Sequence, residues 1–336
     1  MTASVEIRSA TPADVPIIFD QICALADYEK LRHEVTGSAI ALDKHLFGDQ
    51  PCIEALIAEI AGDPVGFALY FPTYSTTVFR SGIYLEDLYV QPSARGQGVG
   101  KALLSTLARR LVDRNWSHLN WSVLDWNTPA IQFYERIGAK IVENIRTCRL
   151  TGDALRQFGD RYRSGTPRSS PARPVTAADM PAVYELVRGN VEADGSPFIG
   201  QMAALEAALF GDQPFVEAIV IEQDDEIAGL ALYFTSYSTF LTQPGLHIED
   251  LFVWPQFRGR GLGTALIAAV VTAAIAKRSR NGIDRNFGRV EWGVRTWNHD
   301  ARRLYERIGA IVMEDWRLCH FGGDALKQLA RSLDDS

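Results

Sequence analysis

Hydrophobic and polar positions alternate along the first half of the chain in a pattern that predicts strands and helices in turn. Residues 5–7 alternate as a short strand does, and Thr11 with Pro12 supplies the N-cap and first-turn proline of a helix that continues to Leu25. Further strands are predicted at 53–60, 65–70, 82–90 and 119–124, and further helices at 101–111 and 129–137. The order predicts an α/β (α+β) fold in which an antiparallel meander leads into a strand, a loop and a helix.

The second half of the chain repeats the first. The hexapeptide LFGDQP at 46–51 recurs unchanged at 209–214. Three more pairs follow in the same order: LEDLYV at 85–90 with IEDLFV at 248–253, RGQGVG at 95–100 with RGRGLG at 258–263, and YERIGA at 134–139 with the same letters at 305–310. The last pair is spaced more widely, which places a short insertion in the basic stretch 277–282. A repeat of this length is a duplicated domain rather than a solenoid unit.

A length of 336 residues also fits two domains. The stretch 159–173 is rich in Gly, Ser, Pro and Arg, which is typical of a linker. We therefore expect domains at 1–160 and 171–336 with a linker at 161–170, each domain holding a mixed, mainly antiparallel sheet flanked by helices. Pro171 and Pro174 predict that the first strand of the second domain is short or lies at an edge.

Composition narrows the possible partners. Hydrophobic residues make up 47% and charged residues 22%, as in ordinary globular proteins, and the net charge of -7 favours a basic ligand over nucleic acid or anionic lipid. The four cysteines are spread singly, as expected for reduced thiols, and His45, His118, His247 and His320 show no metal-binding spacing. The longest apolar run, at 264–276, is too short to span a bilayer. We expect a cytoplasmic protein without a metal or a membrane partner.

A glycine-rich loop follows the strand that ends at Val90. The segment 95–100 (RGQGVG) precedes a helix, so backbone N–H groups meet at a positive helix terminus where glycine allows close approach. Such a loop can cradle a pyrophosphate, although a plain turn has the same composition. The Lys-Ser/Thr pair of a Walker motif and the glycine spacing of a Rossmann motif are both absent, and the same loop returns at 258–263.

The pattern V-x-P-x-x-R-G-x-G-x-G resembles the acetyl-CoA-binding motif of the GNAT N-acetyltransferases in both repeats. The first repeat further resembles the diamine acetyltransferase group, and most of all its thialysine N-acetyltransferase branch. That likeness rests on LADYEKL at 25–31, FGD at 47–49, YST at 74–76, IYLED at 83–87 and VLDWN at 123–127. It implies two tandem GNAT-like domains, acetyl-CoA as co-substrate with CoA as product, and a small amine as acceptor. It also allows a homodimer or an intramolecular pseudo-dimer of the two domains.

The resemblance also assigns the cofactor contacts. In the first repeat these are Leu88, Tyr89 and Val90 for the thioester carbonyl and pantetheine, Arg95, Gly96, Gln97, Gly98, Val99, Gly100 and Lys101 for the pyrophosphate, and Asn127 for the pantetheine arm. In the second repeat they are Leu251, Phe252, Val253, Arg258, Gly259, Arg260, Gly261, Leu262, Gly263, Thr264 and Asn298.

Four residues are candidates for catalysis. By the resemblance, Tyr134 lies beside the thioester sulfur and can protonate the departing thiolate, and Tyr305 repeats it; the alternative for each is core packing. A substrate ammonium must lose a proton before it attacks, and the resemblance gives this role to Glu86 through a water, and to Glu249 in the second repeat. The alternative is a solvated carboxylate or an ion pair. Glu86 and Asp87 are adjacent on a strand, so we expect only one of them to reach a given cleft.

The amine site should include Tyr28 and Glu29 together with Glu86, by the same resemblance. The second repeat has Ala193 and Asp194 at the matching positions, which weakens the case for a shared substrate.

Other departures concern substrate length. Spermidine-type relatives carry an acid where Ser75 and Ser238 stand here, so one counter-charge for a distal ammonium is missing. Trp316 occupies a family-typical position at which the first repeat has Ile145. A lysine-like amino acid or a short diamine is therefore expected rather than spermine.

The sequence thus predicts an acetyl-CoA-dependent N-acetyltransferase for a small primary amine, working by direct attack on the thioester. Two alternatives stay open. The acceptor could be a protein or peptide amine, or one domain, most naturally the second, could bind acyl-CoA without turnover.

Overall fold

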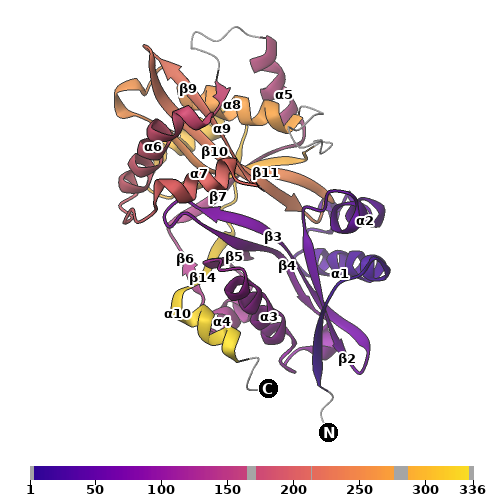
Figure 1. Cartoon of the computed structure of the whole chain (residues 1–336). Coiled ribbons are helices and arrows are strands. Elements are labelled where there is room, and N and C mark those ends of the chain that lie inside the picture. Colours follow the sequence, from indigo (N-terminus) through magenta and orange to yellow (C-terminus); the bar gives the residue numbers. More distant parts are fainter. Residues whose placement is uncertain (1–3, 165–171, 213, 276–286, 333–336) are drawn as a thin grey trace.

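The computed structural model describes residues 4–164, 172–212, 214–275 and 287–332. It contains two seven-stranded mixed sheets with helices packed on their faces (Figure 1). The first sheet has the order β1-β2-β3-β4-β5-β14-β6, and the second has the order β13-β7-β12-β11-β10-β9-β8. In each sheet the central pair is parallel, β4 with β5 and β11 with β12, and the other pairs are antiparallel. The expected mixed α/β architecture in tandem is confirmed.

The elements follow one another in the same order in both repeats. The first repeat contains β1 (Val5–Ser9), α1 (Val15–Tyr28), α2 (Ala39–Phe47), β2 (Glu54–Ile60), β3 (Asp63–Ser75), β4 (Arg80–Val90), α3 (Val99–Asp113), β5 (His118–Leu124), α4 (Thr128–Arg136), β6 (Lys140–Val142), β7 (Ile145–Thr151) and α5 (Gly152–Ser164). The second contains β8 (Arg173–Pro174), α6 (Met180–Ala193), α7 (Met202–Phe210), β9 (Val216–Gln223), β10 (Glu226–Ser238), β11 (Gln243–Val253), α8 (Leu262–Ile275), β12 (Arg289–Arg295), α9 (His299–Arg307), β13 (Ile311–Val312), β14 (Trp316–Gly322) and α10 (Gly323–Arg331).

Local sequence explains where these elements begin and end. The Thr11 hydroxyl and the Asp14 carboxylate form a capping box immediately before α1, which then buries Ile18 and Ile22. The strand β8 is two residues long and pairs only with β9 at the edge of its sheet, as the prolines in this segment predict.

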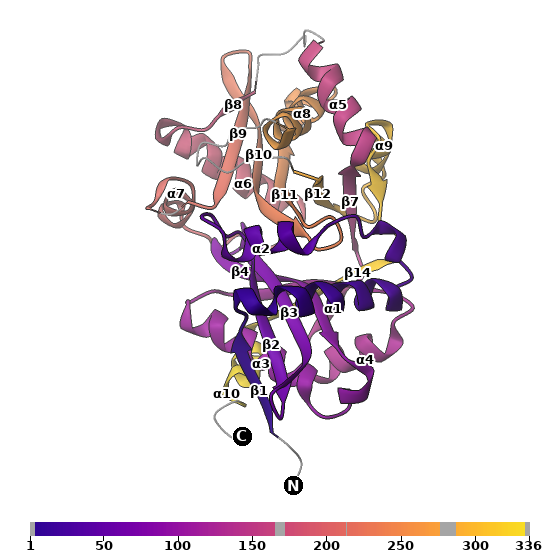
Figure 2. The same cartoon turned by 90° about the vertical axis from the view of Figure 1, so that its right-hand side faces the viewer.

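The two repeats exchange their last strands, which the sequence does not reveal. β7 of the first repeat pairs with β12 of the second, with Cys148 opposite Trp292, and β14 of the second repeat pairs with β5 of the first, with Cys319 opposite Trp121. The helix that follows each exchanged strand also packs against the other repeat: α5, after β7, packs on α8, and α10, after β14, packs on α3 (Figures 1 and 2). Each sheet is therefore completed by the other repeat.

Because of this exchange, the expected domain ranges do not coincide with the two packed units of the structure. The ranges 1–160 and 171–336 divide the sequence, but residues 145–164 pack with the second sheet and residues 316–331 pack with the first. Within the expected linker, residues 161–164 continue α5, and residues 165–170 lie outside the described part of the chain. The basic insertion at 277–282 also lies outside it.

Three hydrophobic clusters form the core of the described part of the chain. One lies between the first sheet and the helices α3 and α10, and a second lies between the second sheet and α8 with α5. The third is shared by the two repeats, because it joins α1, α2 and β3 to α6, α7 and β10 in a single buried set. Ile18, Leu69, Val187 and Leu232 are all fully buried in this shared cluster. Apolar packing therefore fixes the two sheets against each other.

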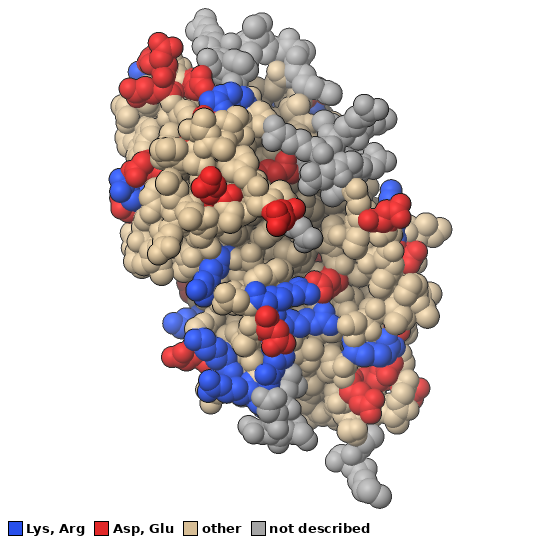
Figure 3. All heavy atoms as spheres, in the orientation of Figure 1, with Lys and Arg blue, Asp and Glu red and all other residues tan. Residues whose placement is uncertain are grey.

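The surface carries charges of both signs. On the face in Figure 3, Lys and Arg side chains gather over the lower half of the molecule, with acidic residues among them. On α3, Arg110 and Arg114 both contact Glu54. None of the helices in the described ranges combines the length and the apolar character that a bilayer span requires.

Candidate active site

A β-bulge opens the first sheet at Glu86. In the register of β3 with β4, Leu69 lies opposite Asp87 and Tyr70 lies opposite Leu85, so Glu86 is the extra residue. The parallel pairing of β4 with β5 runs from Ile83 to Leu85 and stops before the bulge. Beyond this point the two strands separate, and residues 88–90 line a cavity. The second sheet has the same bulge at Glu249.

The cavity has a volume of about 800 Å³ and is lined by both repeats. Glu86 and Asp87 both line it, so the expectation that only one of them could reach the cleft is wrong. The reason is the bulge, which interrupts the strict alternation of side chains that a regular strand imposes.

The glycine-rich loop forms one end of the cavity. Gly96 has φ 77° and Gly98 has φ 86°, a left-handed backbone that favours glycine, and no atom lies within 4 Å of the Cβ that either could carry. The loop is held by the Arg95 guanidinium, whose Nε donates to the carbonyl oxygen of Val90 at 3.0 Å. Gly98 is the N-cap of α3, so free N–H groups face an open space of the kind a pyrophosphate fits.

The structure brings most of the predicted cofactor contacts of the first repeat together. Those that line the cavity are Leu88, Tyr89, Val90, Arg95, Gly96, Gly98, Val99, Gly100, Lys101 and Asn127, while Gln97 does not line it. The corresponding loop of the second repeat has the same backbone, with φ 76° at Gly259 and 85° at Gly261.

Three carboxylates meet in the cavity beyond the loop. Burial, together with the nearby Glu86 carboxylate, raises the pKa of Glu29 to about 7. Burial also raises the pKa of Asp87 well above its usual range, and its Oδ2 atom is buried without a hydrogen-bond partner in the described structure. Burial raises the pKa of Glu86 as well, against the opposing effect of Arg289. A group of partly desolvated carboxylates of this kind favours a cationic ligand.

Glu86 belongs to a row of alternating charges that crosses between the repeats. The Nη2 atom of Arg289 donates to Oε1 of Glu86 at 3.0 Å, and the Nε atom of Arg289 lies 2.8 Å from Oε2 of Glu291. Arg149, on the exchanged strand β7, donates from Nε to Oε1 of Glu291 at 2.7 Å. Burial acts to raise the pKa of Glu291, but Arg289 and Arg149 outweigh it and lower that pKa to about 2. Glu291 is thus ionised at neutral pH, and the row ends at Arg149.

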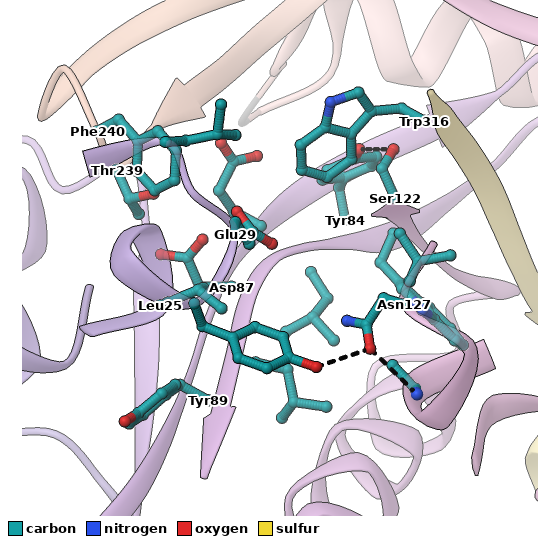
Figure 4. A pocket seen from close by; sticks show the side chains of 18 of the residues that line it. Leu25, Glu29, Tyr84, Asp87, Tyr89, Ser122, Asn127, Thr239, Phe240 and Trp316 are labelled. Atoms are coloured by element: carbon teal, nitrogen blue, oxygen red, sulfur yellow. Dashed lines mark hydrogen bonds between the residues drawn. The ribbon is translucent and has the colours of Figure 1, made fainter. Parts of the chain in front are cut away.

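Tyr134 lies on α4 with its ring against Trp121, at a centroid distance of 4.9 Å. Burial raises the pKa of this phenol above its usual range, so it stays protonated and can donate a proton. Nearby, the Tyr28 hydroxyl donates to Oδ1 of Asn127 at 3.0 Å, and the same oxygen caps α4 by accepting from Ala130 (Figure 4). With its oxygen used in this way, the Asn127 amide keeps its NH₂ group as a donor.

The second repeat contributes one wall of this cavity. Thr239 and Phe240 come from the turn after β10, and Trp316 comes from the exchanged strand β14 (Figure 4). Ser238 lines the cavity as well, whereas Ser75 does not, so the serine that stands in place of the acid in this cavity is Ser238 of the second repeat. The physical reason is that the end of β10 and the turn after it reach the first site, while Thr76, just after β3, donates a hydrogen bond to Asp250 of the second repeat. Sequence reasoning also missed Arg149, Arg289 and Glu291; a hint was available only in Trp316, which has no aromatic counterpart in the first repeat.

The predicted catalytic residues of the second repeat have different surroundings. Tyr305 packs on Trp292 as Tyr134 packs on Trp121, at 5.1 Å between ring centroids. Burial, followed by the neighbouring Asp250, raises the pKa of Glu249 to about 8. Asp194, which matches Glu29, is paired with Arg295 at 2.9 Å.

The corresponding site of the second repeat has no such row of charges among the described residues. Aligning β12 with β5 and β14 with β7 on their shared Trp and Cys residues gives His118, Asn120 and His320 as the counterparts of Arg289, Glu291 and Arg149. Burial lowers the pKa of His118 to about 4, so it is neutral at physiological pH. The two halves therefore share the cofactor loop but differ in the charges beside it. The described residues contain no cluster of His, Cys, Asp and Glu that could hold a metal ion.

Comparison with known proteins agrees with the geometry. The model of the Acetyltransferase (GNAT) family matches residues 23–139 and again residues 184–310. The chain belongs to this family and is an N-acetyltransferase with two GNAT domains in tandem. Members of the family use acetyl-CoA as co-substrate.

Named relatives and solved structures add detail. The thialysine N-epsilon-acetyltransferase of Sus scrofa is 39% identical over 170 residues, which is 47% of this chain and 99% of that protein. The L-ornithine N5-acetyltransferase NATA1 of Arabidopsis thaliana is 31% identical, over 44% of this chain and 85% of that protein. Among solved structures, a GCN5-related N-acetyltransferase from Sphaerobacter thermophilus is 22% identical, covers 95% of each chain and has a TM-score of 0.53, which shows the same fold. A tandem GNAT protein from the clavulanic acid biosynthesis pathway has a TM-score of 0.52 at 16% identity and covers 95% of this chain.

Proposed function

We propose that the cavity of the first repeat acetylates the terminal amine of a small cationic molecule, a lysine-like amino acid or a short diamine. The observation that carries this proposal is the meeting of three carboxylates, Glu29, Glu86 and Asp87, beside a glycine loop suited to a pyrophosphate and a protonated tyrosine. The thialysine and ornithine acetyltransferases among the relatives support it, since their named acceptors carry a primary amine on a short chain.

The residues of the cavity can divide the work as follows. Bound acetyl-CoA supplies an acetyl thioester, which the neutral amine attacks directly. The acidic group draws in the ammonium form of the substrate, and Glu86 accepts its proton through a water. Glu29, with a pKa of about 7, passes that proton to solvent. Backbone N–H groups of residues 88–90 polarise the carbonyl, and Tyr134 returns a proton to the leaving sulfur.

The second repeat is a candidate for a different role. Its loop keeps the backbone that fits acetyl-CoA, but Glu249 has a pKa of about 8 and is mostly protonated at neutral pH, and Asp194 is already paired. We propose that this half binds acetyl-CoA and contributes a wall to the first site without acetylating the same amine. The two repeats would then form an intramolecular pseudo-dimer, which the exchanged strands β7 and β14 support.

An acetyl-transfer screen on the full chain tests the function. The release of CoA thiol is measured with amino acids, short diamines, polyamines and peptides that carry a single free amine. The proposal expects turnover with lysine, ornithine or a short diamine well above that with spermine or peptides. Preferred turnover of peptides would favour a protein amine as acceptor and would overturn the small-molecule proposal.

A further inference from the structure

Arg149 lies at the end of the charge row, and its side chain makes one hydrogen bond among the described residues. Its Nε atom donates to Glu291, and no further hydrogen bond of this guanidinium occurs among the described residues. Its side chain is 29% exposed and lines the cavity, whereas the Arg289 side chain is 7% exposed and is occupied by Glu86, Glu291 and the carbonyl oxygen of Tyr237. A guanidinium has five N–H donors in a planar fork, so Arg149 keeps donors that can face a ligand.

The charges on either side of Arg149 define what such a ligand would be. Glu86 and Glu291 are both bound by Arg289, and Glu291 is bound by Arg149 as well. Glu29 and Asp87 stand at the other end of the row, near Glu86, and one buried carboxylate oxygen of Asp87 has no hydrogen-bond partner among the described residues. One cavity therefore offers negative charge beside the thioester region and positive charge at Arg149. This arrangement is complementary to a molecule with an ammonium at one end and a carboxylate at the other.

We propose that Arg149 binds the carboxylate of the acceptor, so that the substrate is an amino acid whose side chain ends in a primary amine, rather than the corresponding diamine. This inference rests on the proposed function of the cavity and specifies its substrate class. The bond would be a charge-assisted pair between the planar guanidinium and the planar carboxylate. The second repeat has His320 in place of Arg149, held by Asn120 at 2.9 Å, so the feature belongs to the first site alone.

The test compares lysine with 1,5-diaminopentane, and ornithine with 1,4-diaminobutane, because each pair differs only in the carboxylate. Wild-type protein should have a higher kcat/KM for each amino acid than for its diamine. Arg149→Gln should raise the KM for lysine about ten- to hundredfold, the loss expected for one charge-assisted hydrogen-bonded pair, while the KM for 1,5-diaminopentane stays the same or falls. Arg149→Lys should recover part of the affinity for lysine.

A matched control and distinct outcomes keep the two proposals separate. Arg156→Gln removes an exposed arginine of α5 that is paired with Asp153, and it should leave both KM values unchanged. If Arg149→Gln raises the KM for lysine and the diamine alike, or raises the KM for acetyl-CoA instead, Arg149 is structural or contacts the cofactor and the inference fails. If wild-type protein acetylates neither member of either pair, the proposed function itself fails.

Discussion

Arg289 of the second repeat donates a hydrogen bond of 3.0 Å to Glu86 of the first. Both side chains are nearly inaccessible, at 7% and 12% exposure, so this ion pair lies inside the boundary between the repeats. It joins the proposed proton acceptor of one repeat to a strand of the other. The proposed active site is thus a property of the full chain, and experiments on an isolated first repeat would remove the strands that complete it.

Arg289→Met tests this dependence. The change leaves Glu86 and Glu291 buried without their shared partner, so the free energy of unfolding should fall by about 3 kcal/mol or more. Loss of the cation should also raise the pKa of Glu86 further and shift the pH profile of kcat/KM toward alkaline values. Urea unfolding and a pH series measure the two effects. Arg156→Met breaks an exposed pair and should change neither the free energy of unfolding nor the pH profile by a measurable amount. If Arg289→Met also changes neither, the ion pair between Arg289 and Glu86 does not stabilise the site.

Glu29→Gln tests the acidic group. A carboxylate with a pKa of about 7 must be ionised to attract the substrate and to pass on a proton, so kcat/KM of wild-type protein should rise with pH through that value. The glutamine variant should lose this limb of the profile and have a higher KM for cationic amines. Asp194→Asn, at the matching position of the second repeat, is the control and should keep the limb. If kcat/KM of the Glu29→Gln variant still rises with pH through about 7, this rise reports the ionisation of another group.

Gly98→Val and Gly261→Val test the two cofactor loops. Both glycines have left-handed backbone, at φ 86° and 85°, and a branched side chain there would strain the loop and enter the space in front of the N–H groups. Isothermal titration of wild-type protein with acetyl-CoA should show two sites, and each variant should retain one. Only Gly98→Val should abolish acetylation of the amine. A Gly98→Val protein that still fills two sites would mean that the pyrophosphate binds elsewhere.

Glu249→Gln tests the ionisation of the second site through stability. Because folding raises the pKa of Glu249 from its usual range to about 8, the folded state holds this proton more tightly than the unfolded state. Wild-type protein should therefore lose stability as the pH rises from about 5 to 9, and the permanently neutral variant should not share this loss. The difference in the free energy of unfolding should grow by about 4 kcal/mol in favour of the variant between pH 5 and pH 9, measured by urea unfolding at pH 5, 7 and 9. A constant difference would place the pKa of Glu249 in its ordinary range.

Local pattern and internal repetition predicted much of the fold. The apolar runs at 53–60 and 65–70 predicted the hairpin of β2 and β3, and the glycine loop at 95–100 predicted the turn before α3. The exchange of β7 and β14 could not be predicted, because both strands have the same spacing of apolar residues and can pair with either Trp-bearing strand. That pairing decides that Arg149, Arg289 and Trp316 lie at the first site, so their presence there could not be predicted either. Glu86 and Asp87 both reach the cavity because of a β-bulge, and the sequence LED at 85–87 does not indicate that bulge.

We propose that amine acetylation takes place at the first repeat, in a site that the second repeat completes. The deciding experiment compares the turnover of the preferred amine by full-length Tyr134→Phe and Tyr305→Phe, together with their binding of acetyl-CoA. Tyr134→Phe should lower kcat by about ten- to thousandfold with little change in acetyl-CoA affinity, while Tyr305→Phe should stay within about twofold of wild type. Equal losses in the two variants, or a loss confined to Tyr305→Phe, would contradict it.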